Sequence, residues 1–269
     1  MKKKPKIFSK IALAVMLLFF YLPIIYIILF SFNSDRSLLK FSGFSFQWYE
    51  KLFSDDTMLM SIFYTAVIAL IATAVSTVVG TIAAIGLSKS KKWLQNCVEQ
   101  VNNLPVLNPD IVTAIGLMML FSTFAIEKGF LTLLLAHIMF CTPYVMLSVT
   151  PKLRRLDPNL MDAALDLGAT PMQALIKVIV PQIMPGILSG ALIAFTMSFD
   201  DFVISYFVTG NGVSNISIVV YSMTKRINPS VNALSTIVIL IVVITLTVVN
   251  VVPMIKERNE RKKQMLERA

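Results

Sequence analysis

Three carboxylates lie inside long apolar stretches of the 269-residue chain, at Asp110, Asp200 and Asp201. A charge at the centre of a bilayer costs about 2.5–3.5 kcal/mol on insertion scales, so such residues usually face a cavity or a partner and are functional candidates. The apolar stretches contain no Lys or Arg that could serve an anion. The chemistry that these side chains can supply is therefore the binding of a cation.

Each acidic residue also has a plainer interpretation. Asp110 follows Asn108-Pro109, and an acid in the first turn of a helix is favoured by the helix dipole. Asp200 could instead form an ion pair with a Lys or Arg of a partner chain. Neighbouring helical residues point about 100° apart, so Asp200 and Asp201 need not face the same way.

Aromatic residues near these acids offer a second kind of cation contact. Phe199 directly precedes the acidic pair, and Trp48 lies in the first connector. An aromatic ring can bind an ammonium group through a cation–π contact, whereas a Trp can also act as a membrane-interface anchor. The single histidine, His137, fits a packed or hydrogen-bonded core position better than a proton relay.

These residues must be positioned by membrane helices, because the chain is 56% hydrophobic and only 14% charged. Soluble domains have about 25% charged residues. A span needs about 20 apolar residues. Six stretches qualify: Ile11–Phe32, Ser61–Leu87, Leu104–Ala125, Phe130–Val149, Ile183–Val208 and Asn232–Met254. We expect an all-α polytopic membrane protein with six transmembrane helices, in which residues 1–269 form a single transmembrane domain.

The basic residues predict the topology. Of the 24 Lys and Arg, 18 fall at the termini and in the second and fourth connectors. Cytoplasmic segments carry the Lys/Arg excess, so both termini are expected in the cytoplasm. The formal charge of +9 then reflects topology and contact with lipid headgroups, and no nucleic-acid partner is expected.

The fourth connector is predicted to form a cytoplasmic helix-turn-helix over residues 157–181. Asp157 and Pro158 are typical of a helix start, and Gly168 suits the left-handed residue that ends a helix. Thr170 and Pro171 repeat the start signal. The alternative is an amphipathic helix lying on lipid.

Two features argue against a lipid-bound helix. Asp162 and Asp166 make its polar face acidic, which anionic lipid repels. No aromatic residue stands in either short helix. The connector is therefore expected to contact a protein.

Small residues predict close helix packing in two spans. Gly186, Gly190 and Ala194 repeat every four residues in the fifth span, and Gly80 and Ala84 do so in the second. Such faces let helix backbones approach closely. They could pack within this chain or against a partner.

The fourth connector resembles the "EAA" loop of the permeases of ABC importers, whose pattern is E-A-A-x-x-x-G, nine residues, then I-x-L-P. The matching residues are Asp162, Ala163, Ala164, Gly168, Val178, Val180 and Pro181. Asp replaces Glu, and Val replaces Ile and Leu. In that family the loop is the coupling helix, seated in a cleft of a cytoplasmic ATPase. The resemblance implies that Asp162, Ala163, Ala164, Asp166, Gly168 and Pro181 couple this chain to such an ATPase.

Other segments resemble polyamine-importer permeases, most closely the C-type permeases of spermidine/putrescine importers. They are "FSFQWYEKLF" (44–53), "GALIAFTMSFDDFVISYFVTG" (190–210) and "YSMTKRINPSVNALSTI" (221–237). A polyamine is a flexible chain of methylenes between ammonium groups. Separated carboxylates with aromatic walls would suit it, and the candidate set is Trp48, Asp110, Phe199, Asp200 and Asp201.

The chain lacks the nucleotide-binding motif G-x-x-x-x-G-K-[S/T]. We therefore expect a transport subunit, not an enzyme, with no cofactor or metal of its own. The resemblance implies two copies of an ATPase that binds ATP and Mg²⁺, a second permease and an extracytoplasmic binding protein. It also implies a bacterial cytoplasmic (inner) membrane location.

Three other functions fit parts of the sequence. The same machinery could carry a metal chelate, a sugar or an amino acid. A proton-coupled secondary carrier could use Asp110, Asp200 and His137, although such carriers often show internal repeats and none is evident. A membrane scaffold without transport activity is the third.

Overall fold

The computed structural model describes residues 7–210, 212–224, 228–244 and 247. Regular structure in these residues is helical, apart from one isolated bridge between Asn33 and Phe44, so the all-α prediction is confirmed. The chain divides into two compact units: Thr57–Val219, and Met1–Asp56 together with Val220–Ala269. The larger unit, Thr57–Val219, carries all the predicted site residues except Trp48.

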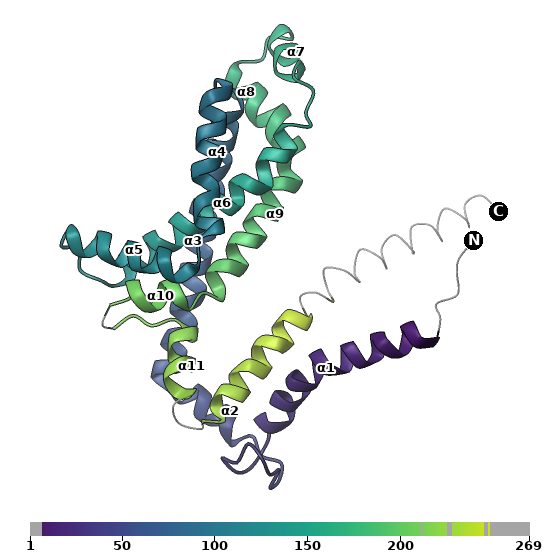
Figure 1. Ribbon diagram of the computed structural model, residues 1–269, viewed down its shortest axis with the longest axis vertical. Coiled ribbons are helices and arrows are strands. Elements are labelled where there is room, and N and C mark those ends of the chain that lie inside the picture. Colours follow the sequence, from purple (N-terminus) through teal and green to yellow (C-terminus); the bar gives the residue numbers. More distant parts are fainter. Residues whose placement is uncertain (1–6, 211, 225–227, 245–246, 248–269) are drawn as a thin grey trace. The chain divides into compact units, whose positions relative to one another are not determined.

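Long helices form the body of the larger unit. They are α3 (Asp56–Ser88), α4 (Lys92–Leu107), α5 (Asp110–Thr123), α6 (Phe130–Leu153) and α9 (Val180–Phe199). The short helices are α7 (Leu160–Asp166), α8 (Pro171–Ala174), η1 (Leu175–Ile179), α10 (Val203–Val208) and α11 (Ile216–Thr224). Figure 1 shows α7 and α8 at one end of this unit, and α5 and α10 farther along it on one side.

Four of the predicted membrane spans have a matching helical segment. The segments Lys10–Ser31, Asp56–Ser88, Phe130–Leu153 and Pro171–Phe199 are long and apolar enough to cross a membrane. An apolar helix over Ser230–Ile244 stands where the sixth span, Asn232–Met254, was predicted to begin. Apart from Thr247, the rest of that span lies outside the described residues, as do Lys225, Arg226 and the basic residues of the C-terminal tail.

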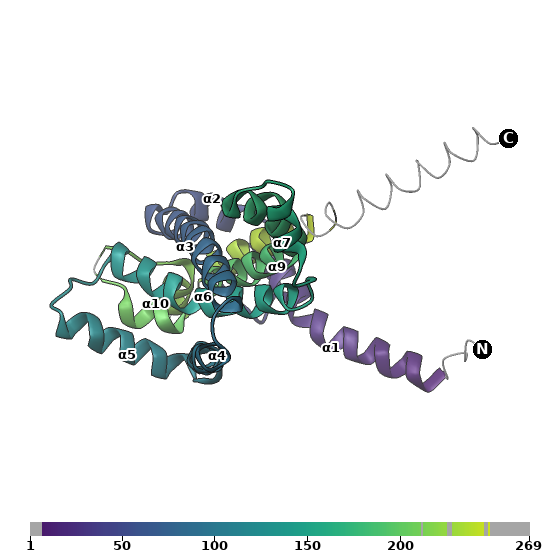
Figure 2. The same ribbon diagram turned by 90° about the horizontal axis from the view of Figure 1, so that it is seen from above.

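The third predicted span, Leu104–Ala125, is not one straight helix. The helix breaks at Asn108-Pro109, and α4 and α5 are bent by 106°. In Figure 2, α4 is seen nearly end-on while α5 lies in the plane of the view. The cause is local: the residue before a proline is driven out of the α conformation, and Asn108 is extended with ψ 142°.

The helix that carries the fifth predicted span, Ile183–Val208, has different bounds from that span. The helix begins in the connector at Pro171, passes through the π-helix η1, and ends at Phe199. Pro181 has no N–H for a normal helical bond. In the wider turn before it, Val180 N donates to Leu175 O five residues back, so the helix continues without a break.

The small-residue faces pack within this chain. A Cβ on Gly190 would lie 3.1 Å from Val145 Cα and 3.2 Å from Ser148 Cβ, both on α6. A Cβ on Gly186 would lie 3.0 Å from Ser148 O, also on α6. On α3, a Cβ on Gly80 would meet Val145 at 2.9 Å. Gly80, Gly186 and Gly190 thus all lie close to α6 of the same chain.

The smaller unit begins with α1 (Ile7–Ser31) and contains α2 (Gln47–Phe53). The loop between them folds around the buried side chain of Asn33. Its Nδ2 donates to Ser37 O and Lys40 O, both at 2.9 Å, and its Oδ1 accepts from Ser42 N at 2.8 Å. One amide side chain therefore holds three backbone groups of the connector.

Candidate functional site

A cavity of about 300 Å³ collects the three carboxylates that the sequence scatters over the chain. It lies where the α4–α5 break and the α9–α10 break meet α6. Its walls are Pro105, Asp110, Thr113, Phe140, Tyr144, Thr196, Met197, Asp200, Asp201, Phe202, Val203 and Ile204. No Lys or Arg is among these lining residues, so the cavity suits a cation. We call it the acidic cavity.

Two helix interruptions bring the acids together. Asp110 is the first residue of α5, directly after the break at Pro109. Asp200 follows the last residue of α9, and its N–H donates to Thr196 O at 3.2 Å. Both side chains are exposed, and neither has an ion pair within the described part of the chain. Asp110 therefore has both features that were considered for it: it stands in the first turn of a helix, and it lines the cavity.

Asp201 is placed differently from Asp200. Its side chain is only 8% exposed. Its Oδ2 accepts from Ser205 N and Ser205 Oγ, both at 2.7 Å, and its Oδ1 accepts from Ile204 N at 3.3 Å. The carboxylate thereby binds the first free N–H groups of α10, the usual task of an acidic cap. Asp201 borders the acidic cavity, but both of its oxygens are already engaged.

The predicted aromatic residues are not the ones that wall the acidic cavity. Phe199 is half-buried and stacks on Phe195, with ring centroids 5.7 Å apart, away from the lining. The aromatic walls are Phe140, Tyr144 and Phe202 instead. Sequence reasoning missed Phe140 and Tyr144, although their spacing of four residues on one helix face was an available signal.

Trp48 lies in the smaller unit and has a structural position there. Trp48 is 5% exposed, and its Nε1 donates to Asn33 O at 2.6 Å. The Nζ of Lys51 stands 5.8 Å from the ring centroid, so a cation of the protein already occupies one cation–π position. A contact between Trp48 and a substrate stays a prediction.

His137 is hydrogen-bonded in the core, as expected. It is 1% exposed and joins α6 to Ser198 on α9 and Ser205 on α10. Among the residues that the structure describes, no group of three or more His, Cys, Asp and Glu side chains is arranged to hold a metal ion.

The connector at the other end of the larger unit contains the predicted turn. Gly168 has φ +86°, the left-handed conformation expected of it. Thr170 Oγ1 accepts from Gln173 N at 3.3 Å, and Gln173 Oε1 accepts from Thr170 N at 3.0 Å. This reciprocal pair is a capping box. The first helix starts later than predicted, at Leu160, because the Asp157 carboxylate closes a turn with Asn159 N (2.9 Å).

The surface of this connector combines acids with exposed apolar side chains. Asp162, Ala163, Asp166, Gly168 and Pro181 are exposed, whereas Ala164 is buried. Three large apolar side chains also face outward: Leu167 (90% exposed), Met172 (63%) and Ile176 (57%). Large exposed apolar side chains on a polar loop are consistent with a protein-binding surface.

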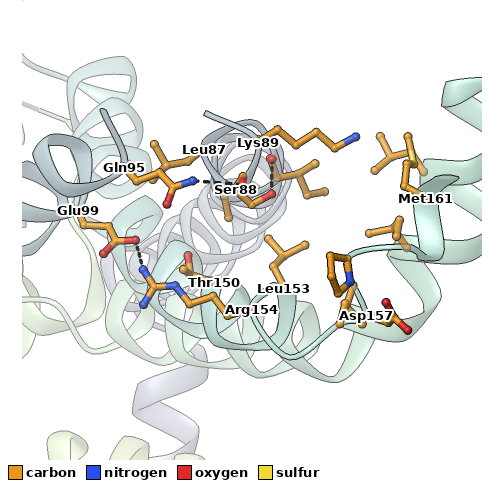
Figure 3. A pocket seen from close by; sticks show the side chains of 16 residues that line it. Leu87, Ser88, Lys89, Gln95, Glu99, Thr150, Leu153, Arg154, Asp157 and Met161 are labelled. Carbon is orange, nitrogen blue, oxygen red and sulfur yellow. Dashed lines mark hydrogen bonds and ion pairs between the residues drawn. The ribbon is translucent and has the colours of Figure 1, made fainter. Parts of the chain in front are cut away.

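A second cavity, of about 410 Å³, lies behind this connector (Figure 3). Arg154 donates to Glu99 on its wall, and Gln95 Nε2 donates to Ser88 O at 3.2 Å. Leu175 and Ile179 of the π-helix line it as well. Residues of the connector, of α4 and of α6 thus line one common space.

Comparison with known proteins places these features in context. Residues 76–261 match the family described as "Binding-protein-dependent transport system inner membrane component". The spermidine/putrescine transport system permease protein PotC of Haemophilus influenzae is 39% identical over 224 residues, which cover 83% of this chain and 87% of that protein. The putrescine transport system permease protein PotI of Escherichia coli is 37% identical, covering 82% of each chain.

Solved structures share the fold. A chain of a bacterial ABC transporter that imports the acidic polysaccharide alginate superposes with a TM-score of 0.68 at 14% identity, covering 92% of this chain and 95% of that one. A chain of an amino acid ABC transporter superposes with a TM-score of 0.54 at 20% identity, covering 78% and 95%. At these identities the likeness supports the fold alone.

Proposed function

This chain belongs to the family of binding-protein-dependent transport system inner membrane components, and we propose that it is a permease subunit of an ATP-driven importer of polyamines. It is a multi-pass membrane protein and a transport subunit, not an enzyme. The observation that supports the substrate class is the acidic cavity, where Asp110 and Asp200 stand exposed beside Phe140, Tyr144 and Phe202 without a basic residue in the lining.

The chemistry of this cavity matches a polyamine. An ammonium group gains from a carboxylate that accepts a charge-assisted hydrogen bond and from an aromatic face. The methylenes between ammonium groups gain from apolar walls such as Met197 and Val203. An anionic substrate would find only like charges there. The names of the relatives, which include spermidine and putrescine, agree with this assignment.

The connector with Gly168 supports energy coupling by a separate ATPase. Its outward face, with Leu167, Met172 and Ile176, offers apolar area for docking, and Asp162 and Asp166 add charge at its rim. We propose two ATPase copies that bind ATP and Mg²⁺, a second permease beside this chain, and an extracytoplasmic binding protein. We further propose that residues 1–269 act as one permease domain in the cytoplasmic membrane, with both termini in the cytoplasm.

Reconstitution tests the proposed function directly. This chain is assembled with its ATPase, second permease and binding protein in vesicles, and uptake of labelled spermidine and putrescine is measured with ATP and with a non-hydrolysable analogue. We expect uptake only with ATP. Uptake driven by a proton gradient without ATP would support a secondary carrier instead. ATP-driven uptake of a different substrate, with polyamines excluded, would refute the substrate class.

A further inference from the structure

A buried polar cluster lies beside the acidic cavity and includes residues that the proposed transport path does not use. At its centre is His137 on α6. His137 Nδ1 is 2.6 Å from Ser198 Oγ on α9, and His137 Nε2 is 3.0 Å from Ser205 Oγ on α10. All three side chains are buried. One imidazole therefore bridges the helix before the Asp200–Phe202 break and the helix after it.

The hydrogen-bond inventory fixes the roles of the ring nitrogens. Ser205 has one hydroxyl proton, which it donates to Asp201 Oδ2 at 2.7 Å. Ser205 Oγ must then accept from its other neighbours, namely Asn215 Nδ2 at 2.8 Å and His137 Nε2. A neutral imidazole with its proton on Nε2 leaves Nδ1 to accept from Ser198. Every buried polar atom of the cluster is satisfied in this tautomer.

Asn215 extends the cluster to the segment after α10. Its Nδ2 also donates to Asp201 O at 2.9 Å, and its Oδ1 accepts from Ile218 N at 3.0 Å in α11. The backbone carbonyl and the carboxylate of Asp201 are thus both held. Because Asp201 is the neighbour of Asp200, fixing its backbone and side chain fixes the direction in which the Asp200 side chain leaves the chain.

We propose that His137 is a positioning residue for substrate binding: it holds Ser205 and, through Ser205, Asp201, so that the break after α9 presents Asp200 to the acidic cavity. This inference rests on the proposed transport function, because it assigns His137 a role in that function. His137 is not among the cavity-lining residues, so it acts through the loop. The His137 side chain joins the end of α9 to the start of α10 through buried hydrogen bonds. A fully satisfied buried network of this kind makes the local structure rigid.

The test uses the assembled membrane complex without its binding protein. Equilibrium binding of labelled spermidine is measured for wild type, His137→Leu and His137→Gln. Leu removes both hydrogen bonds, whereas the Gln amide can still donate to Ser205. We expect spermidine binding about tenfold weaker in His137→Leu, the scale of one lost hydrogen bond to a charged group. We expect His137→Gln to restore most of it. A merely structural role would lower complex yield in both variants without this rescue.

A second readout needs no substrate. In a Cys97→Ser background, Asp200→Cys is labelled from outside with a cationic thiol reagent, with His137 intact or replaced by Leu. We expect the labelling rate to change by about threefold or more, because position 200 then populates other orientations. Asn215→Asp, which loses the amide donors at unchanged size, should act in the same direction. Leu133→Val, a fully buried change one turn away on α6, should leave both readouts at the wild-type level.

The two readouts separate the possible failures. Wild-type binding and labelling in assembled His137→Leu complexes would overturn the positioning role. A wild-type complex that binds no spermidine would overturn the proposed substrate, while labelling at position 200 would still decide the role of His137.

Discussion

Asp200 and Asp201 are adjacent in sequence, yet their carboxylates have opposite surroundings: that of Asp200 is exposed at the acidic cavity, and that of Asp201 accepts three hydrogen bonds from α10. The difference follows from the end of α9. Once the helix stops at Phe199, the two side chains no longer follow helical spacing. One of them can close the first turn of α10 while the other stays free for a ligand.

This division of roles predicts different effects of the two amide substitutions. Asp200→Asn keeps the size and removes the charge, so polyamine uptake per assembled complex should fall. Loss of a hydrogen bond to a charged group costs about 1.5–3 kcal/mol, roughly a tenfold to hundredfold loss of site affinity. ATPase activity without substrate should change little, because the connector adjoins the first residue of α9 and Asp200 follows the last residue of that 20-residue helix.

Asp201→Asn provides the comparison for Asp200→Asn. An amide cannot accept on both sides, so one or two donors at the start of α10 lose their partner, which costs about 1–3 kcal/mol of folding stability for a buried group. Thermal unfolding of the solubilised complex should therefore shift for Asp201→Asn and not for Asp200→Asn. If Asp200→Asn instead dissociates the complex, its role is an ion pair with a partner subunit. Wild-type uptake in both single mutants and the double mutant would show that neither carboxylate serves the substrate.

Much of this arrangement could be predicted from sequence, and the remainder has identifiable causes. The turn at Gly168 and the cap at Thr170 depend on a few neighbouring residues, so their signals are local and the structure confirms them. The break at Asn108-Pro109 was hidden, because an apolar count over Leu104–Ala125 does not register a bend. The bridge between His137 and Ser205 could not be predicted, since the two residues lie 68 positions apart in the chain.

Gly168→Val tests the coupling connector. Gly168 has φ +86°, a conformation that costs an ordinary residue about 1–2 kcal/mol and a β-branched one more. No heavy atom lies within 4 Å of the position that a Cβ would take, so the strain is in the backbone alone. We expect weaker co-purification of the ATPase and lower uptake, with normal membrane insertion.

Gly86→Val is the matched control for Gly168→Val. Gly86 lies in α3, also has open space around the added Cβ, and has no positive φ. Valine is tolerated somewhat better than glycine inside a helix. ATPase co-purification should therefore remain normal in this variant. Equal co-purification and uptake in Gly168→Val and Gly86→Val would refute a coupling role for the connector.

Gly190→Val tests whether the small-residue face of α9 packs within the subunit. The added Cβ would meet the backbone of Val145 at 3.1 Å, which cannot move aside as a flexible side chain can. Overpacking of this kind costs about 1–3 kcal/mol. The solubilised chain on its own, without any partner, should lose thermal stability relative to wild type. An unchanged single chain whose complex nevertheless fails to assemble would assign the face to a partner subunit.

The predicted topology is tested by labelling from outside intact cells. Lys40 lies in the first connector and Lys91 in the second, and the two are separated by α3, a helix long and apolar enough to cross the membrane once. Lys40→Cys and Lys91→Cys are each placed in a Cys97→Ser background, since Cys97 is exposed and Cys141 is buried. A membrane-impermeant thiol reagent should modify position 40 in intact cells and position 91 only after the membrane is opened. The reason is that the second and fourth connectors hold an excess of Lys and Arg, and such an excess is typical of cytoplasmic segments.

Two outcomes would contradict this topology. If both positions react from outside, α3 does not cross the membrane once. If only position 91 reacts from outside, the connector around Gly168 lies on the extracytoplasmic side, where no ATPase could reach it.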